Sequence, residues 1–147
     1  MKHNKFYFLL VFIFAALAFS ACAPKSAAKV EFVPPSVLEP IEGSDIQRVL
    51  LTEKAAERID LQLAAVSDEQ VNGTERKVVP YAAVIYDLEG ATWVYTSPAP
   101  LTFVRESITI DFIEGDQAVL KNGPSSGTQV VTVGVAELYG AETGVKK

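Results

Sequence analysis

The sequence predicts a mainly β protein: a single small antiparallel β-barrel or roll with one short helix. From Val78 onward, apolar runs rich in valine, isoleucine and aromatic residues alternate with short turn sequences, the pattern of antiparallel strands. Helical periodicity is confined to about two turns near residues 53–59, and there is no heptad repeat. About 100 residues form this part of the chain, which is enough for one modest core but not for two.

The amino-terminal residues have the order of a secretory signal peptide. Lys2 and Lys5 precede an apolar run over Phe6–Phe19, and the small residues Ser20-Ala21 follow. At roughly 14 residues the apolar run is short for a membrane span, which needs about 20. We therefore expect residues 1–21 to be a signal peptide.

Cys22, the only cysteine of the chain, follows this segment directly. The run Phe19-Ser20-Ala21-Cys22 resembles the lipobox of bacterial lipoproteins, in which the cysteine thiol is diacylated and becomes the mature amino terminus. The resemblance implies a protein anchored in membrane lipid by acylated Cys22, on the extracytoplasmic side of a cell membrane. No thiol is then left for a disulfide, a metal or nucleophilic chemistry. The alternatives are an ordinary signal peptide with an incidental cysteine and an uncleaved amino-terminal anchor.

The chain predicted to remain after export is acidic. The formal charge of the whole sequence is −5, and without residues 1–21 there are 11 basic and 18 acidic residues, a charge of −7. Nucleic acids are bound mainly by basic residues that neutralise phosphates, so we expect no nucleic-acid partner. The charge also argues against the body of the domain lying on anionic lipid. Residues 22–44 are small, polar and proline-containing, which predicts a lipidated tether.

The folded domain is predicted over residues 45–142, with a short tail at 143–147. Its first half contains a strand, a capped helix, a half-buried strand and a turn. In order, these are Val49–Leu51, residues 53–59 capped by Thr52, the alternating Leu61, Leu63 and Ala65, and Asn72-Gly73 within polar residues 68–77.

The second half of the domain is predicted to contain strands and turns only. In order, these are a strand over 77–87 in which Pro80 marks an edge or bulge, a tight turn at Asp87–Gly90, a return strand at Thr92–Thr96, a long strand over 101–113 with Ile108, Ile110 and Phe112 on one face, a turn at Glu114–Asp116, a strand at Ala118–Leu120, and a last strand over 128–138.

Three motifs in this half resemble the membrane-proximal domain of periplasmic adaptor proteins, the membrane fusion proteins of RND-type and related efflux systems. They are Val-Pro-x-x-Ala-Val at 79–84 with a hairpin ending in Trp-Val-Tyr at 93–95, the strand that bears Arg105, and Gly-x-x-Val-Val-x-x-Gly at 127–134 followed by Glu137-Leu138. The resemblance covers about residues 46–142. It implies the fold of that domain and, as a partner, an inner-membrane transporter against which the domain sits.

The sequence lacks other parts that adaptor proteins carry. No segment has the pattern of their long α-helical hairpin, their lipoyl half-motifs or their separate β-barrel domain. We therefore do not expect this chain to bridge the cell envelope as adaptors do. The docking role of the membrane-proximal domain is the part that such a chain can keep.

The residues of the mature chain do not favour catalysis, so we predict a protein that is not an enzyme and holds no cofactor or metal. The only histidine, His3, is lost with the signal peptide, which excludes imidazole-based acid–base, triad and zinc chemistry. Asp111, Glu114 and Asp116 do not have the spacing of an EF-hand loop. Asp87 and Glu89 flank a tight turn, where no cleft is implied.

The aromatic residues leave a second functional hypothesis open. Trp93, Tyr95 and Phe103 form either part of the sheet core or an exposed platform for stacking sugars, and we favour the core for Trp93. Tyr81 and Tyr86 fall on opposite faces of the predicted strand, so we expect one of them to be exposed. The sequence thus predicts a non-catalytic lipoprotein that docks on a membrane transporter. The alternative is an envelope lipoprotein that binds a ligand or carbohydrate.

Overall fold

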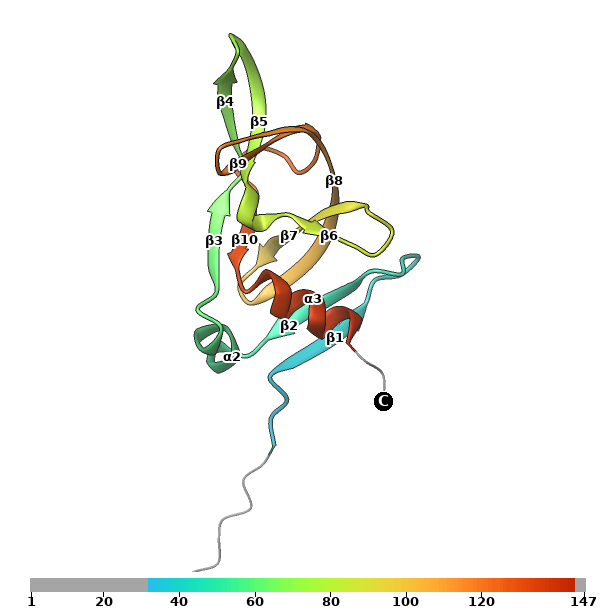
Figure 1. Cartoon of the computed structure of the whole chain (residues 1–147). Coiled ribbons are helices and arrows are strands. Elements are labelled where there is room, and N and C mark those ends of the chain that lie inside the picture. Colours follow the sequence, from blue (N-terminus) through green and yellow to red (C-terminus); the bar gives the residue numbers. More distant parts are fainter. Residues whose placement is uncertain (1–31, 145–147) are drawn as a thin grey trace, which may run out of the picture. The chain divides into compact units, whose positions relative to one another are not determined.

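The computed structural model describes residues 32–144. The chain divides into two units between Val33 and Pro34, and all the strands and helices named here belong to the unit that begins at Pro34. The mainly β class predicted from the sequence is confirmed, because one curled antiparallel sheet forms a half-barrel (Figure 1). Its elements, in chain order, are β1 (Ser36–Pro40), β2 (Gln47–Leu51), α2 (Glu53–Arg58), β3 (Gln62–Ala65), β4 (Ser67–Val71), β5 (Thr74–Pro80), the 3₁₀ turn η1 (Tyr81–Ala83), β6 (Ile85–Tyr86), β7 (Thr92–Ala99), β8 (Thr102–Glu114), β9 (Gln117–Asn122), β10 (Gln129–Val133) and α3 (Val135–Thr143).

The order of the strands explains why the sheet curls. Neighbouring strands run β3-β10-β7-β8-β9-β5-β4, and every pair is antiparallel. The first and last strands of this path, β3 and β4, are separated in the chain by Val66 alone. The backbone N–H of Val66 donates to the Thr128 carbonyl at 2.9 Å, and its carbonyl accepts from Gly127 at 2.8 Å. The two ends of the sheet are therefore held close by one continuous stretch of chain.

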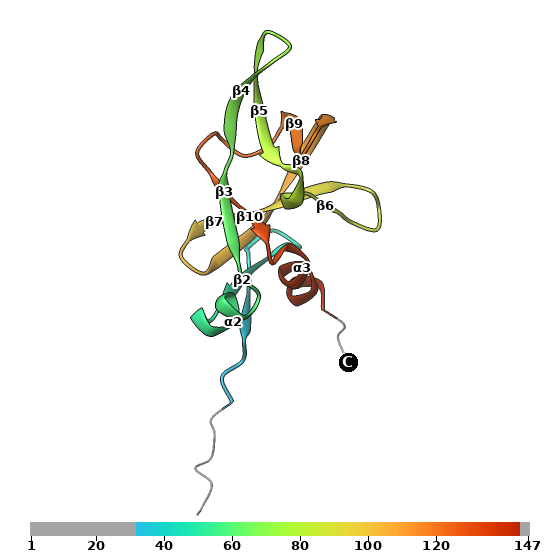
Figure 2. The same cartoon turned by 60° about the vertical axis from the view of Figure 1, so that its left-hand side comes forward.

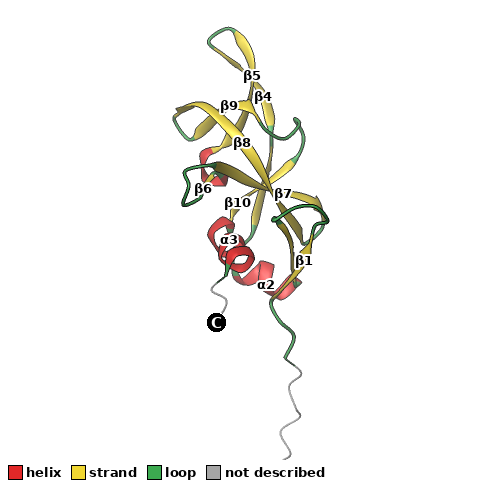
Figure 3. Cartoon of the chain, turned by 90° about the vertical axis from the view of Figure 1, so that its right-hand side faces the viewer, coloured by secondary structure: helices red, strands yellow, loops and turns green. Residues whose placement is uncertain are grey.

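Most of the buried apolar residues belong to two clusters. One lies inside the curl and contains Val66, Val94, Ile108 and Val130. The other contains Tyr95, Phe103, Val131 and the α3 residue Leu138. Both α2 and α3 lie at the end of the sheet that carries the second cluster (Figure 3). The long strands β7 and β8 contribute to both clusters, so they connect the half-barrel to the helices.

Several local predictions are confirmed by backbone geometry. The hydroxyl oxygen of Thr52 accepts a hydrogen bond from the Ala55 N–H at 3.2 Å, as a helix N-cap does, and α2 follows directly. Asn72 and Gly73 have positive φ values of 52° and 78°, which suit the two-residue turn between β4 and β5. The β1 strand, which pairs with β2, lies inside the segment assigned to the tether from its prolines.

The strand predicted over residues 128–138 is wrong in its second half. The strand β10 ends at Val133, and the following residues form helix α3. Gly134 makes the change of direction, because its φ of 92° is a conformation that other residues rarely adopt. The run of valines before Gly134 favours a strand, and Gly140 inside the helix weakens the helical signal.

Two predicted strand faces are also wrong. Leu63 is 42% exposed, whereas Ala64 is half-buried and Val66 is buried, so the inward face of this strand is the opposite one. In β8, Ile108 packs inside the curl and Phe112 packs against a separate cluster on β4, β5 and β9. The β8–β9 register shifts twice between Thr109 and Phe112, and such a bulge changes the face on which later side chains lie.

Candidate functional site

The residues singled out by the sequence lie in different places. Cys22, the predicted lipidation site, and His3 lie outside the described residues. Tyr95 and Phe103 are buried, with 0% and 1% of their surface exposed, and Trp93 is half-buried against the same cluster. These three aromatic residues therefore form core rather than an exposed platform, as favoured for Trp93.

Glu142 in the last turn of α3 is the most deeply buried acidic side chain of the ion pairs, with 3% exposure. Its carboxylate accepts a hydrogen bond from the Tyr95 hydroxyl and one from the Gln47 backbone N–H, the latter at 3.4 Å. Burial, and then the hydrogen bond to Glu142, raise the pKa of the Tyr95 phenol. One carboxylate thus connects α3 to β2 and β7.

Arg105 on β8 supplies the positive charge beside this carboxylate. Its Nε lies 3.3 Å from Glu142 Oε2, and its side chain is 14% exposed. The approach lacks the alignment of a hydrogen bond, so Nε has no hydrogen-bond partner among the described residues. The guanidinium carbon lies 4.6 Å from the centre of the Trp93 ring and 5.6 Å from that of Tyr139. Both distances suit cation–π contact.

Trp93 connects Arg105 to the β6–β7 hairpin. Its indole N–H donates to Asp87 Oδ2 at 2.8 Å. The other oxygen, Oδ1, accepts from the backbone N–H groups of Glu89 at 3.1 Å and Ala91 at 2.7 Å. The Trp93 bond, helped by the two backbone bonds and the charge of Arg105, holds the pKa of Asp87 below its usual value. Asp87 therefore fixes the turn in its ionised form.

The hairpin projects from the side of the half-barrel (Figures 1 and 2). Large apolar side chains on and beside it are exposed. Leu88 at its tip is 97% exposed, Tyr86 is 51% exposed and Tyr81 is 41% exposed. The hydroxyl of Tyr81, by its hydrogen bond, raises the pKa of the neighbouring Tyr86 phenol. We call Tyr81, Tyr86 and Leu88 the hairpin face. One exposed tyrosine was expected and both are exposed, because η1 interrupts the strand alternation on which that expectation rested.

The surroundings of the hairpin face are acidic. Asp87 and Glu89 flank Leu88 and are the only charged residues between Tyr81 and Thr92. The Tyr81 N–H donates to the backbone carbonyl of Asp116 at 2.7 Å, which brings a third acidic residue beside the face. Arg105, the nearest cation along this network, is already paired with Glu142.

Other polar and apolar features of residues 32–144 do not form a second site. Asp111 lies 2.6 Å from Arg76 and 3.2 Å from Lys121, so its charge is compensated within the sheet. Residues 32–144 contain no group of three or more His, Cys, Asp or Glu side chains that could hold a metal ion. No helix in the described part of the chain is long and apolar enough to cross a membrane. An apolar groove of about 160 Å³ lies between β1, β2, α2 and α3, lined in part by Leu51, Ala55 and Leu138.

Sequence reasoning missed the part of the network that lies on α3. Glu142 and Tyr139 were not singled out, because a strand was predicted up to Leu138. The signal that was present is the stretch Ala136-Glu137-Leu138 after Gly134, since all three residues favour helices and Gly134 favours a change of backbone direction.

The comparisons with known proteins give no relative. No family model matches the chain, and neither a curated protein nor a solved structure matches it.

Proposed function

We propose that this chain is a non-catalytic, membrane-anchored lipoprotein whose β domain docks on an inner-membrane transporter. The observation that carries the proposal is Leu88, which stands 97% exposed on a hairpin fixed by three hydrogen bonds to Asp87. Exposed apolar side chains that gather on a held surface are typical of sites that bind another protein. The charged groups Asp87 and Arg105 contact Trp93 and thereby stabilise the hairpin.

The rigidity of the hairpin supports docking in a second way. Ordering a flexible loop on binding costs free energy, so a face that is ordered beforehand binds more tightly for the same contacts. Asp87 holds the turn, Trp93 holds Asp87, and Arg105 stacks on Trp93. The hairpin face is thus connected to the buried Glu142 network and not left as a free loop.

The membrane anchor belongs to the proposal through Cys22. Two or more acyl chains give stable attachment to a membrane, and a tether of limited length raises the concentration of the domain near a membrane partner. The resemblance of residues 46–142 to the membrane-proximal domain of efflux adaptors supports a transporter as that partner. The acidic domain surface supports a protein partner over lipid headgroups or nucleic acid.

Fractionation and crosslinking in cells test this function. The Cys22→Ser variant is expected to leave the membrane fraction; a variant that is still processed and still membrane-bound contradicts the lipid anchor. Chemical crosslinking of the unsubstituted chain in intact cells, followed by mass spectrometry, is expected to recover a membrane transporter. Recovery of no transporter, together with protection of Trp93 from fluorescence quenching by a soluble sugar, contradicts docking.

The alternative of a carbohydrate-binding lipoprotein is favoured by one observation. Tyr81 and Tyr86 are both exposed and neighbour each other, and exposed aromatic rings stack on sugars. Leu88 gives such a site no hydrogen-bonding group. Titration of the purified chain with oligosaccharides separates the two functions, because docking predicts no change in tyrosine fluorescence.

A further inference from the structure

We infer that the hairpin face binds a protein surface on which an apolar pocket is rimmed by lysine and arginine side chains. The inference rests on the docking role proposed above and adds the chemistry of the partner. It follows from the shape of the face, from its charge and from what holds it.

The shape of the face calls for a pocket. Leu88 is 97% exposed at the tip of a tight turn, so its side chain stands clear of the domain. A flat partner surface covers only the end of such a side chain, whereas a concave apolar pocket removes most of it from water. Tyr86, two residues earlier, and Tyr81 beside it are large aromatic residues of the kind enriched at protein interfaces.

The hairpin face is negatively charged, which favours cations around the pocket of the partner. Leu88 lies between Asp87 and Glu89, and Asp116 lies beside Tyr81 through the backbone hydrogen bond between them. Like charges across an interface oppose binding, so the partner surface is complementary when it is positive.

The nearby cation of the domain does not neutralise this charge. Arg105 is paired with Glu142, against which it is largely buried. Among the other cations of residues 32–144, Arg48 contacts Glu39, and Arg76 and Lys121 contact Asp111. Lys54 and Arg58 belong to α2, and Lys77 of β5 donates to the Gly123 carbonyl at 3.4 Å. The acidic residues beside Leu88 are therefore repelled by an anionic lipid surface and attracted by a protein surface with a cationic rim.

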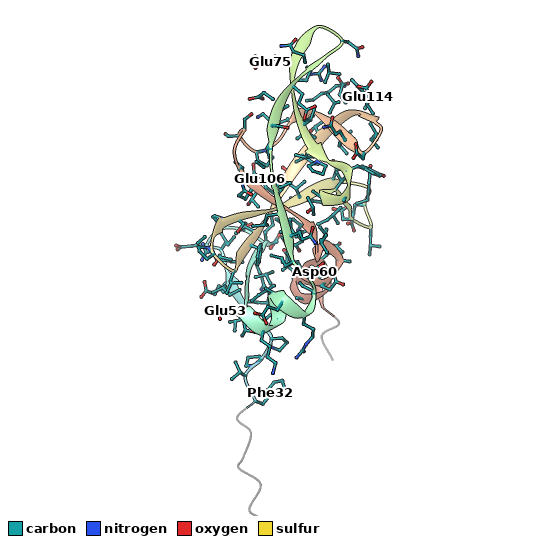
Figure 4. All side chains as sticks on the ribbon, turned by 90° about the vertical axis from the view of Figure 1, so that its left-hand side faces the viewer. Phe32, Glu53, Asp60, Glu75, Glu106 and Glu114 are labelled. Carbon is teal, nitrogen blue, oxygen red and sulfur yellow. The ribbon has the colours of Figure 1, made fainter. Side chains whose placement is uncertain are left out.

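Site-specific photocrosslinking of the full chain in intact cells tests this inference. A photoreactive amino acid replaces Leu88, and in a matched chain it replaces Glu75, an exposed acidic residue on the β4–β5 hairpin (Figure 4). Crosslinking at position 88 is expected to yield a protein whose crosslinked peptides contain more lysine and arginine than acidic residues. Adding Glu89→Lys to that chain is expected to lower the yield several-fold, and adding Glu75→Lys to leave it unchanged.

The remaining outcomes separate the inference from the proposed function. Crosslinks to lipid, no crosslink at position 88, acidic partner peptides, or an equal loss with Glu75→Lys each overturn the inference. If position 88 captures a cationic pocket on a protein that is not a transporter, the inference holds and the proposed function fails. If a transporter is captured from position 75 and not from position 88, the proposed function holds and the inference fails.

Discussion

The hydroxyl group of Tyr95 donates a hydrogen bond to the carboxylate of Glu142, although 47 residues separate them in the chain. Tyr95 belongs to β7 and is fully buried, and Glu142 belongs to the last turn of α3. The contact joins the centre of the sheet to the carboxyl-terminal helix. Arg105 and Trp93 continue the connection to Asp87, so one network extends from α3 to the exposed hairpin.

Replacing Glu142 by Gln tests the weight of this network for stability. The substitution keeps the shape of the side chain but leaves Arg105 without its counter-charge, at a site where 14% of the arginine is exposed. Breaking a buried ion pair on one side costs about 3 kcal/mol, and we expect a loss of that size in the free energy of unfolding. Urea denaturation of the full chain in detergent measures it. Glu137→Gln on the exposed side of the same helix is the control and is expected to change stability by about 0.5 kcal/mol or less.

The Tyr95 phenol gives the domain a predicted sensitivity to alkali. Burial raises its pKa above the unfolded value of 10.0, so the folded state favours the neutral phenol. The stabilisation is fully present below pH 10 and is lost as the pH rises above that value, because the unfolded chain then releases the proton more readily. Thermal unfolding at about pH 8 to 11 is expected to show a smaller loss of stability in the alkaline range in Tyr95→Phe than in the unsubstituted chain. Identical slopes contradict the assignment.

Replacing Trp93 by Phe tests whether the network orders the hairpin. The ring that contacts Arg105 is kept in part, but the N–H group that donates to Asp87 is lost. We expect faster hydrogen exchange at the amides of Glu89 and Ala91, which donate to the same carboxylate. Amides of the β4–β5 hairpin are the internal control. Unchanged exchange at Glu89 and Ala91 shows that the turn holds itself.

The ionised state of Asp87 predicts how the same hairpin responds to acid. Its pKa lies below the ordinary value of 3.8, chiefly through the Trp93 bond, so the stabilisation is present above that value and is lost as the pH falls through the lowered pKa. The hairpin amides are therefore expected to stay protected from exchange at about pH 5. Asp87→Asn is expected to lose part of that protection at every pH.

Two glycines near α3 are expected to respond oppositely to alanine. Gly134 has a φ of 92°, and a Cβ atom there would lie 2.9 Å from Ile59 Cδ1. Gly134→Ala is therefore expected to lower the free energy of unfolding by more than about 1 kcal/mol. Gly140 lies inside the helix, and a Cβ atom added there would meet no other atom within 4 Å, so Gly140→Ala is expected to add about 0.5–1 kcal/mol. Denaturation midpoints of the two variants check the pair.

The features that the sequence predicted well are local ones. The Thr52 cap, the Asn72-Gly73 turn and the Asp87–Gly90 turn are each specified by a few neighbouring residues. Trp93 and Tyr95 share a face because alternation in a short strand is reliable, and both pack on the same cluster. The mainly β fold class follows from many such short patterns together.

The features that it missed depend on distant residues or on irregular backbone. Glu142 acts only because the fold brings α3 against Tyr95 and Arg105, and no local pattern reveals that contact. Leu63 and Phe112 were placed on the wrong faces, since Val66 sets the inward face of one strand and bulges shift the other. A turn at Asp87–Gly90 was predictable, but its fixation by Trp93 was not.

Docking through the hairpin face requires that a partner buries Leu88 when the full chain is in its membrane. Maleimide labelling of Leu88→Cys, in isolated native membranes and in the detergent-purified chain, tests it most directly. Glu75→Cys is the control for access, and the unsubstituted chain gives the background from Cys22. We expect slow labelling of Leu88→Cys in membranes and fast labelling after purification, with Glu75→Cys fast in both. Equally fast labelling of Leu88→Cys in both preparations contradicts it.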